Sequence, residues 1–151
     1  MLALQTLYFE DLSVGMSENL SKTIAASDVV GFAQVTGDRN PIHLSEHFAA
    51  RTPFGGRIAH GLYTAGLISA VIGTRLPGPG AIYLSQSLRF TRPVRIGDTV
   101  TVKLEVLELI AAKRRVRLAT VCTNQNGETV MDGEATVMVP DERAPPGGKP
   151  M

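Results

Sequence analysis

Several residue types that mark particular protein classes are scarce in this sequence. It has 151 residues, with one cysteine, no tryptophan and only 5% aromatic residues. The single cysteine, Cys122, excludes an internal disulfide and suits a reducing compartment; its alternating surroundings, RVRLATVCT, favour a small buried residue over a nucleophile. Few aromatic rings and a balance of 15 basic against 14 acidic residues, spread along the chain, predict no nucleic-acid partner.

Long hydrophobic runs are also missing. The longest apolar stretch, GLYTAGLISAVIG at Gly61–Gly73, is too short to span a bilayer, and MLALQTLYFEDL at the start lacks the features of a signal peptide. We therefore expect a cytoplasmic protein with no membrane partner. The length fits one domain over residues 1–140, followed by a tail, 141–151, whose ERAPPGGKP composition is typical of disorder.

The hydrophobic period changes from helical to strand-like along the chain. Helical spacing predicts helices over 27–35, 46–51 and 61–75, with Ser27 and Ser45 as N-caps of the first two, and LPGPG ends the third. After Ala81 the period becomes two, which predicts at least four antiparallel strands. The clearest strands cover 100–106, 115–118 and 135–139, with Asn126-Gly127 as a hairpin turn.

The helix expected at 61–75 is apolar on nearly every side, so other elements must surround it. A curved antiparallel sheet with its alternating Val and Leu side chains facing inward is the simplest way to do so. The sequence thus predicts an α+β fold, a sheet wrapped around a central helix. A second copy of the chain could cover the remaining apolar surface, which is the first indication of a homodimer.

Chemistry-bearing residues concentrate in TGDRNPIHLSEHF, Thr36–Phe48. Asp38 and His43, with Pro41 bending the chain between them, are suited to share a hydration or dehydration as an acid–base pair. Gly37 and Pro41 predict a tight non-helical turn, and Asn40 is placed to hydrogen-bond the carboxylate or a water molecule. The alternative is an Asx-turn, in which Asp38 bonds its own backbone and His43 is a loop residue without a chemical role.

The same segment contains a zinc-like motif. His43-Leu44-Ser45-Glu46-His47 spells H-x-x-E-H, and histidines at this spacing share a helix face. Pro41 nevertheless places His43 at the very start of any helix, and no acidic helix with a further ligand follows. We therefore predict a site without a metal and a partly exposed His47 on a helix.

A second segment supplies a backbone hydrogen-bond donor. Ile58-Ala59-His60-Gly61 leads directly into the apolar helix, so the Gly61 N–H lies at a helix N-terminus, where a developing negative oxygen is stabilised. His60 either participates or only packs and caps. A base, an acid and an oxyanion donor are the groups needed to add water beside a thioester carbonyl.

Two blocks of the sequence resemble a known family. FAQVTGDRNPIHLSEHFAARTPFGGRIAHG and GLISAVIGTRLPGPGAIYLSQSLRFTRPVRIGDTV are similar to the MaoC-like (R)-specific enoyl-CoA hydratases, and the resemblance covers about Ala26 to Pro140. It implies a hot-dog fold, a homodimer and an acyl-CoA substrate. It further implies reversible syn hydration of trans-2-enoyl-CoA to (R)-3-hydroxyacyl-CoA, without a metal or an organic cofactor.

The resemblance also assigns residues. It implies that Asp38 and His43 are the catalytic pair, that Gly61 supplies the oxyanion N–H, and that Ser69 and Ile72 bound the acyl pocket. Four alternatives stay open: a thioesterase of the same fold, a 3-hydroxyacyl-[acyl-carrier protein] dehydratase, a hydratase of a branched or dicarboxylic enoyl-CoA, and a non-catalytic acyl-CoA-binding subunit. A binding subunit would not need the carboxylate of Asp38.

Overall fold

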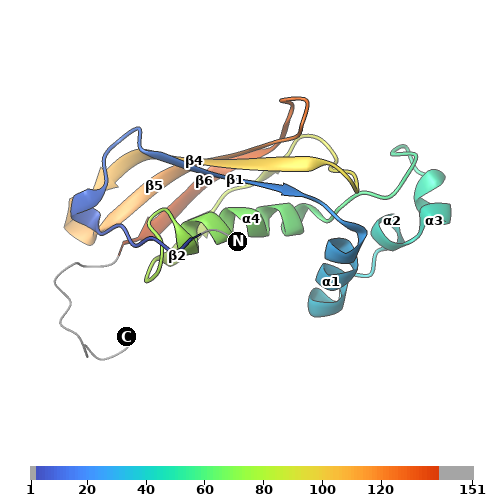
Figure 1. Cartoon of the computed structure of the whole chain (residues 1–151), viewed down its shortest axis with the longest axis horizontal. Helices are drawn as coiled ribbons and strands as arrows, with labels where there is room; N and C mark the ends of the chain where they lie inside the picture. Colours follow the sequence, from blue (N-terminus) through green and yellow to red (C-terminus); the bar gives the residue numbers. More distant parts are fainter. Residues whose placement is uncertain (1–2, 140–151) are drawn as a thin grey trace.

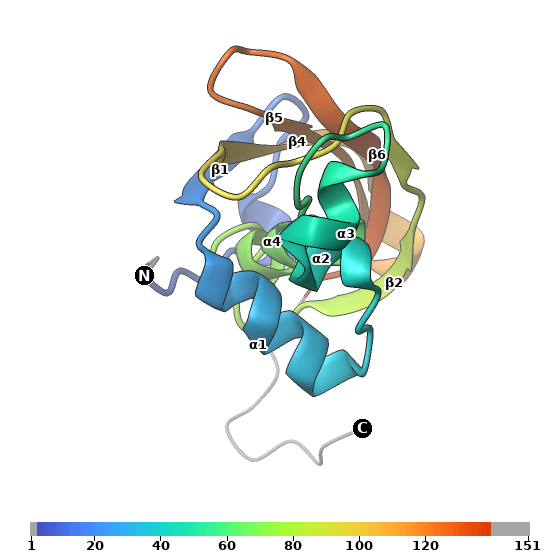
Figure 2. The ribbon, with the colours of Figure 1, turned by 90° about the vertical axis from the view of Figure 1, so that its right-hand side faces the viewer.

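A curved antiparallel sheet arches over one central helix, and three shorter helices lie beyond that helix's N-terminal end (Figures 1 and 2). The computed structural model describes residues 3–139, so the expected boundary at residue 140 and the expected tail 141–151 lie outside the described residues. The strands are β1 Ser17–Thr23, β2 Ile82–Gln86, β3 Arg89–Phe90, β4 Thr99–Ile110, β5 Arg115–Thr123 and β6 Thr129–Met138. They form the order β1-β4-β5-β6-β2, with β3 also paired to β6.

The helices are α1 Ala26–Thr36, α2 Pro41–Leu44, α3 Glu46–Ala50 and α4 Gly61–Thr74, with short 3-10 turns at Phe9–Asp11 and Ala111–Lys113. The end-on view shows the sheet wrapped around α4 (Figure 2). The predicted α+β arrangement is therefore confirmed. None of the helices in the described range is long and apolar enough to cross a membrane.

The alternating apolar and polar residues of the strands match the packing of the sheet on α4, because the apolar side chains face the helix. Val100, Val102 and Leu104 of β4 are fully buried, while Lys103 between them is exposed. On the helix side, Ile68 and Val71 are fully buried too. Because burying one such side chain contributes about 1.5–3 kcal/mol, this inner layer favours the wrapped arrangement over any exposed alternative.

Cys122 belongs to the same inner layer. It is fully buried on β5, and burial raises the pKa of its thiol to about 12. A thiol that stays protonated is a poor nucleophile, so the interpretation of Cys122 as a buried packing residue is confirmed.

Two local predictions about the helices were wrong. The N-cap of α1 is Ala25, and the carboxylate of Asp28 stabilises this end by accepting from the Ala25 N–H at 2.8 Å, so Ser27 is not the cap. The segment from Pro41, expected to be a non-helical turn, forms the single-turn helix α2. Ser45, by contrast, caps α3 as predicted, since its Oγ accepts from the Phe48 N–H at 3.1 Å.

Strand β1 was not predicted at all. Its sequence, SENLSKT, has one large apolar residue, and the sequence therefore carries no alternation of apolar and polar side chains. It nevertheless pairs along its whole length with β4 at the edge of the sheet. An edge strand needs few apolar residues, because much of its surface faces water.

Candidate active site

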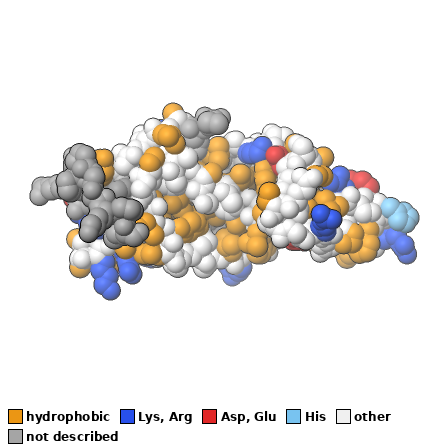
Figure 3. All heavy atoms as spheres, turned by 90° about the horizontal axis from the view of Figure 1, so that it is seen from below, with side chains coloured by type: hydrophobic (Ala, Val, Ile, Leu, Met, Phe, Trp, Pro, Cys, Tyr) orange, Lys and Arg blue, Asp and Glu red, His pale blue; other side chains and the backbone are white. Residues whose placement is uncertain are grey.

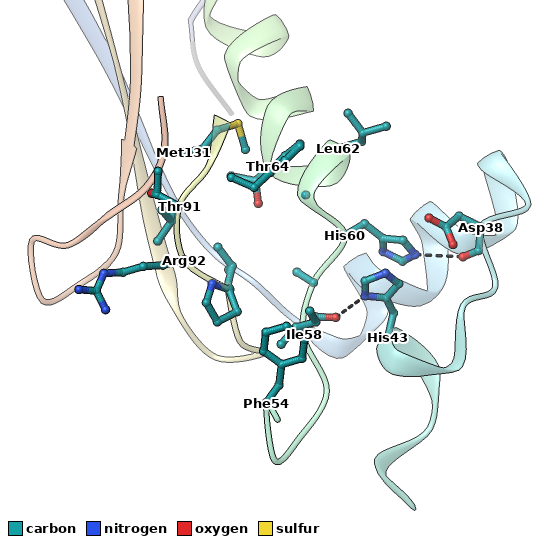
Figure 4. Close-up of a pocket in the computed structure, with 16 residues that line it drawn as sticks. Asp38, His43, Phe54, Ile58, His60, Leu62, Thr64, Thr91, Arg92 and Met131 are labelled. Carbon is teal, nitrogen blue, oxygen red and sulfur yellow. Dashed lines mark hydrogen bonds between the residues drawn. The ribbon is translucent and has the colours of Figure 1, made fainter. Parts of the chain in front are cut away.

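A cavity of about 510 Å³ lies where α4 begins, between the sheet, α2 and the loop that leads into α4 (Figure 4). It brings together Asp38, His43 and Gly61, the three residues expected to carry the chemistry. Most of its remaining wall is apolar, with Phe54, Ile58, Phe90, Val94, Val130 and Met131 among the lining residues. The arrangement is typical of a small-molecule site, which is apolar with few convergent polar groups.

Asp38 is held in a tight loop between α1 and α2. Gly37 ends α1 with φ of +81°, a left-handed conformation that glycine adopts without strain. The Asp38 N–H then donates to Thr36 Oγ1, and Asp38 Oδ1 accepts from the Asn40 N–H, both at 3.2 Å. This is the Asx-turn named above as the alternative. It is compatible with a chemical role, because the turn fixes the side chain while the residue stays exposed beside the cavity.

His43 lies in α2 and is only 8% exposed. Its Nδ1 is 2.7 Å from the carbonyl oxygen of Ile58, and since a carbonyl only accepts, Nδ1 carries the proton (Figure 4). In the neutral ring the lone pair is then on Nε2. Burial lowers the pKa of His43 from its usual 6.5, and the bond to Ile58 and the charge of Asp38 oppose that shift only in part. The site therefore favours a neutral imidazole that accepts a proton at Nε2.

Gly61 is the first residue of α4, so its N–H has no partner within the helix. Glycine also permits a close approach here: a Cβ at this position would lie 2.5 Å from Cε1 of Phe90, so that exposed ring would have to move. The bare backbone leaves the amide accessible to a ligand in the cavity. With the helix dipole behind it, this N–H is placed to stabilise a negative oxygen.

Sequence reasoning left His60 uncertain and missed Thr64. His60 is 2% exposed, and its side chain does not cap α4; Nε2 donates instead to the carbonyl of Asp38 at 3.0 Å. Thr64 is 1% exposed and lines the cavity, and its Oγ1 has no hydrogen-bond partner among the residues that the structure describes. A polar residue inside the apolar run GLYTAGLISAVIG was the available signal for Thr64. A hydroxyl buried without a partner costs about 1–3 kcal/mol, which a polar group of a bound ligand would offset.

The remaining predicted site residues do not line this cavity. The side chain of Asn40 is used to begin α2, where its Oδ1 accepts from the Ile42 N–H at 3.1 Å, so only its backbone supports Asp38. Ser69 is exposed on α4, and Ile72 is 2% exposed in the core. A second cavity of about 390 Å³, between α4 and β2, is lined by Ala65, which lies one helical turn before Ser69.

The zinc-like motif does not converge on one point. His47 is exposed on α3, as predicted, whereas His43 faces the cavity. A different group, Asp38, His43 and His60, has one potential ligand atom of each within 4.8 Å of the others. One nitrogen of each ring is, however, already bonded to a backbone carbonyl, His43 Nδ1 to Ile58 and His60 Nε2 to Asp38, so neither of these two nitrogens is free to bind an ion. A site without a metal stays a prediction.

Comparison with known proteins gives consistent matches. Residues 13–131 match the family model described as a MaoC like domain. The chain is 72% identical to the 3-hydroxybutyryl-CoA dehydratase of Methylorubrum extorquens, over 91% of this chain and 87% of that protein. It is 56% identical to the (R)-specific enoyl-CoA hydratase of Rhodospirillum rubrum, over 88% and 92% of the two chains.

A solved structure matches equally well. The unliganded R-hydratase PhaJ1 of Pseudomonas aeruginosa superposes with a TM-score of 0.88 and is 52% identical. The match covers 92% of this chain and 89% of that chain. The range of the family model, residues 13–131, includes the central helix and the segment that carries the candidate site.

Proposed function

This chain belongs to the MaoC-like dehydratase family, with its hot-dog fold, and from that premise we propose that it is an (R)-specific enoyl-CoA hydratase. As a hydro-lyase it adds water reversibly and syn to trans-2-enoyl-CoA, giving (R)-3-hydroxyacyl-CoA. One observation carries the proposal: Asp38, His43 and Gly61, whose N–H has no partner within α4, line one cavity, in a chain 56% identical to a protein named for this activity.

The thioester carbonyl accepts from the Gly61 N–H. When water attacks C3, the electrons of the double bond move through C2 towards the carbonyl oxygen, which becomes an enolate oxygen. The amide and the dipole of α4 stabilise that oxygen most when the charge has developed, which is the condition for catalysis rather than mere binding. The apolar wall of the cavity strengthens this interaction by excluding bulk water.

Asp38 and His43 hold the attacking water. The carboxylate of Asp38 accepts a hydrogen bond from one O–H of the water, which stays intact, and Nε2 of neutral His43 accepts from the other O–H and takes its proton as the C3–O bond forms. The resulting imidazolium, stabilised by the Asp38 charge, returns the proton to C2 on the same face, which gives syn addition. The tautomer set by Ile58, with the lone pair of His43 on Nε2, supports this assignment of the base, which the sequence alone left open between Asp38 and His43.

A short acyl chain is the proposed substrate, because the 72% identical relative is named for a four-carbon dehydratase substrate. Ser69 and Ile72 remain proposed residues of the acyl pocket. The second cavity is lined by Ala65, one helical turn before Ser69, and we propose that it receives the end of the acyl chain. No cofactor is assigned to the reaction, and a cytoplasmic location stays a prediction.

We propose a homodimer formed through the β2 edge of the sheet. Within the described chain β2 pairs only with β6, and its Ile82, Tyr83 and Leu84 are each about 40% exposed. Hydrophobic side chains also lie across the face where the sheet does not cover α4 (Figure 3). An open apolar edge favours pairing with a second copy. Light scattering should give about twice the 16.1 kDa chain mass, and Leu84→Lys should yield the monomer.

Crotonyl-CoA tests the function. Hydration should remove the absorbance of the enoyl thioester without releasing a thiol, as measured in parallel with a thiol reagent. Thiol release would identify a thioesterase instead. Slow turnover of the CoA thioester but fast turnover of the same acyl group on acyl-carrier protein would identify the dehydratase alternative, and binding without turnover the acyl-CoA-binding subunit.

A further inference from the structure

His60 contacts or adjoins Asp38, His43 and Gly61, the three residues of the proposed reaction. The reaction as described above assigns no role to His60 itself. Its Nε2 donates to the Asp38 carbonyl at 3.0 Å, and its ring lies on the His43 ring with 3.8 Å between centroids (Figure 4). It is also the N-cap residue of α4, directly before Gly61.

The bond to Asp38 is a long-range tether. The other hydrogen bonds of the loop are local: Asp38 bonds Thr36 and Asn40, and the Arg39 N–H bonds the Gly37 carbonyl. Within the described part of the chain, the bond to His60 is the only hydrogen bond that joins Asp38 to a residue outside its own loop. Without it, the exposed carboxylate depends on a five-residue turn for its position relative to the cavity.

The ring of His60 is fixed on its second side as well. Phe32 of α1 packs against it at 4.6 Å between centroids, and the whole residue is 2% exposed. Because the Asp38 carbonyl only accepts, Nε2 carries the proton, and Nδ1 is buried with no hydrogen-bond partner among the described residues. Residue 60 therefore needs a flat ring that fits between Phe32 and His43, and a donor at Nε2 for the Asp38 carbonyl. Its Nδ1 takes part in neither contact.

We propose that His60 is a positioning residue of the hydration reaction. Through the donor at Nε2 and the contact with the His43 ring, it holds the Asp38 carboxylate, the His43 imidazole and the Gly61 amide in one fixed arrangement. It lines the cavity, and the proposal assigns it no proton transfer. This inference rests on the proposed function, since it concerns the same reaction.

Two substitutions separate the ring from the donor. His60→Phe keeps a ring against His43 and removes the donor, whereas His60→Gln keeps an N–H near the place of Nε2 and removes the ring. We expect His60→Phe to lower kcat about 10²-fold, the effect of displacing reacting groups by about 1 Å, with little change in KM. His60→Gln should recover much of that loss. His47→Phe, the same change at the exposed histidine of α3, is the matched control and should alter neither constant.

A double-mutant cycle then tests whether His60 acts through Asp38. In an Asp38→Asn background the carboxylate is already lost, so His60→Phe should have a much smaller effect on kcat than in the wild type. Circular dichroism and thermal unfolding confirm that each variant is folded, and His60→Leu serves as a second variant without a donor if the Phe variant does not fold.

The inference is overturned if a folded variant without the donor retains wild-type kcat. It is equally overturned if His60→Gln is as slow as His60→Phe, or if His60→Phe has the same effect in both backgrounds. A wild-type protein that does not hydrate any enoyl-CoA would contradict the proposed function itself, which is a different outcome from each of these.

Discussion

Replacing Gly61 with proline removes the proposed oxyanion donor, which no side-chain substitution can reach. Proline is well tolerated at the first position of a helix, where the N–H has no intrahelical partner. The preceding residue is suitable too, because His60 has an extended ψ of 132°, the region that a following proline requires. The change should therefore remove one hydrogen bond to the substrate while leaving α4 intact.

The structure also shows what control is needed. A Cβ at position 61 would lie 2.5 Å from the ring of Phe90, so alanine and proline both displace that ring. Phe90 is 55% exposed and can turn towards solvent. Gly61→Ala causes the same collision but keeps the N–H, and so the ratio of the Pro variant to the Ala variant isolates the amide. Repeating both changes with Phe90→Ala removes the collision altogether.

Losing one oxyanion donor costs about 2.7–4 kcal/mol of transition-state stabilisation, or about 10²–10³ in kcat. We expect this loss in Gly61→Pro relative to Gly61→Ala, with a much smaller change in the affinity for the thioester. The assay is crotonyl-CoA hydration under saturating substrate, with circular dichroism to confirm folding. Equal turnover in folded Pro and Ala variants would refute the role of the amide.

Four further predictions concern the proposed site. Asp38→Asn and His43→Ala should each lower kcat by about 10²–10⁴, and the double variant should be little worse than the worse single one; near-normal turnover in Asp38→Asn would refute the pair. Because burial lowers the pKa of His43, its neutral form persists below pH 7, so a pH profile of kcat/KM should fall only below pH 6.5; half-loss at a higher pH would contradict this. Exhaustive chelation should leave turnover unchanged and elemental analysis should find no stoichiometric zinc, with His47→Ala neutral; one zinc per chain and abolished turnover would restore the H-x-x-E-H motif. Ser69→Leu should shift preference towards shorter enoyl-CoA substrates by about 1–3 kcal/mol per methylene, whereas a uniform loss at all chain lengths would place Ser69 outside the pocket.

The elements that the sequence predicted well are those whose side chains follow a strong period. The buried helix α4 and the strand β4 are set by apolar residues that the fold must cover, such as Ile68 and Val102, so their pattern determines their environment. Strand β1 could not be predicted in this way, because its stability comes from backbone pairing with β4 rather than from apolar side chains of its own.

The site residues also divide into those that the sequence indicates directly and those whose role depends on the fold. Asp38, His43 and Gly61 were found because their residue types and order indicate chemistry, and the structure brings them to one cavity. The role of Asn40 towards a ligand stays a prediction; its capping of α2 was not foreseen, because an asparagine beside a catalytic candidate and an asparagine that caps a helix look alike in sequence. The tautomer of His43 depends on a carbonyl of a distant residue, Ile58, and only the fold shows that contact.

The central claim is stereospecific chemistry at this cavity, and the dehydration direction tests it most directly. Purified protein is given (R)-3-hydroxybutyryl-CoA or (S)-3-hydroxybutyryl-CoA separately, and the absorbance of the enoyl thioester is followed. We predict that crotonyl-CoA forms from the (R) enantiomer alone and that Asp38→Asn abolishes this reaction. Equal reaction of both enantiomers, a preference for (S), or an unchanged rate in Asp38→Asn would contradict the account.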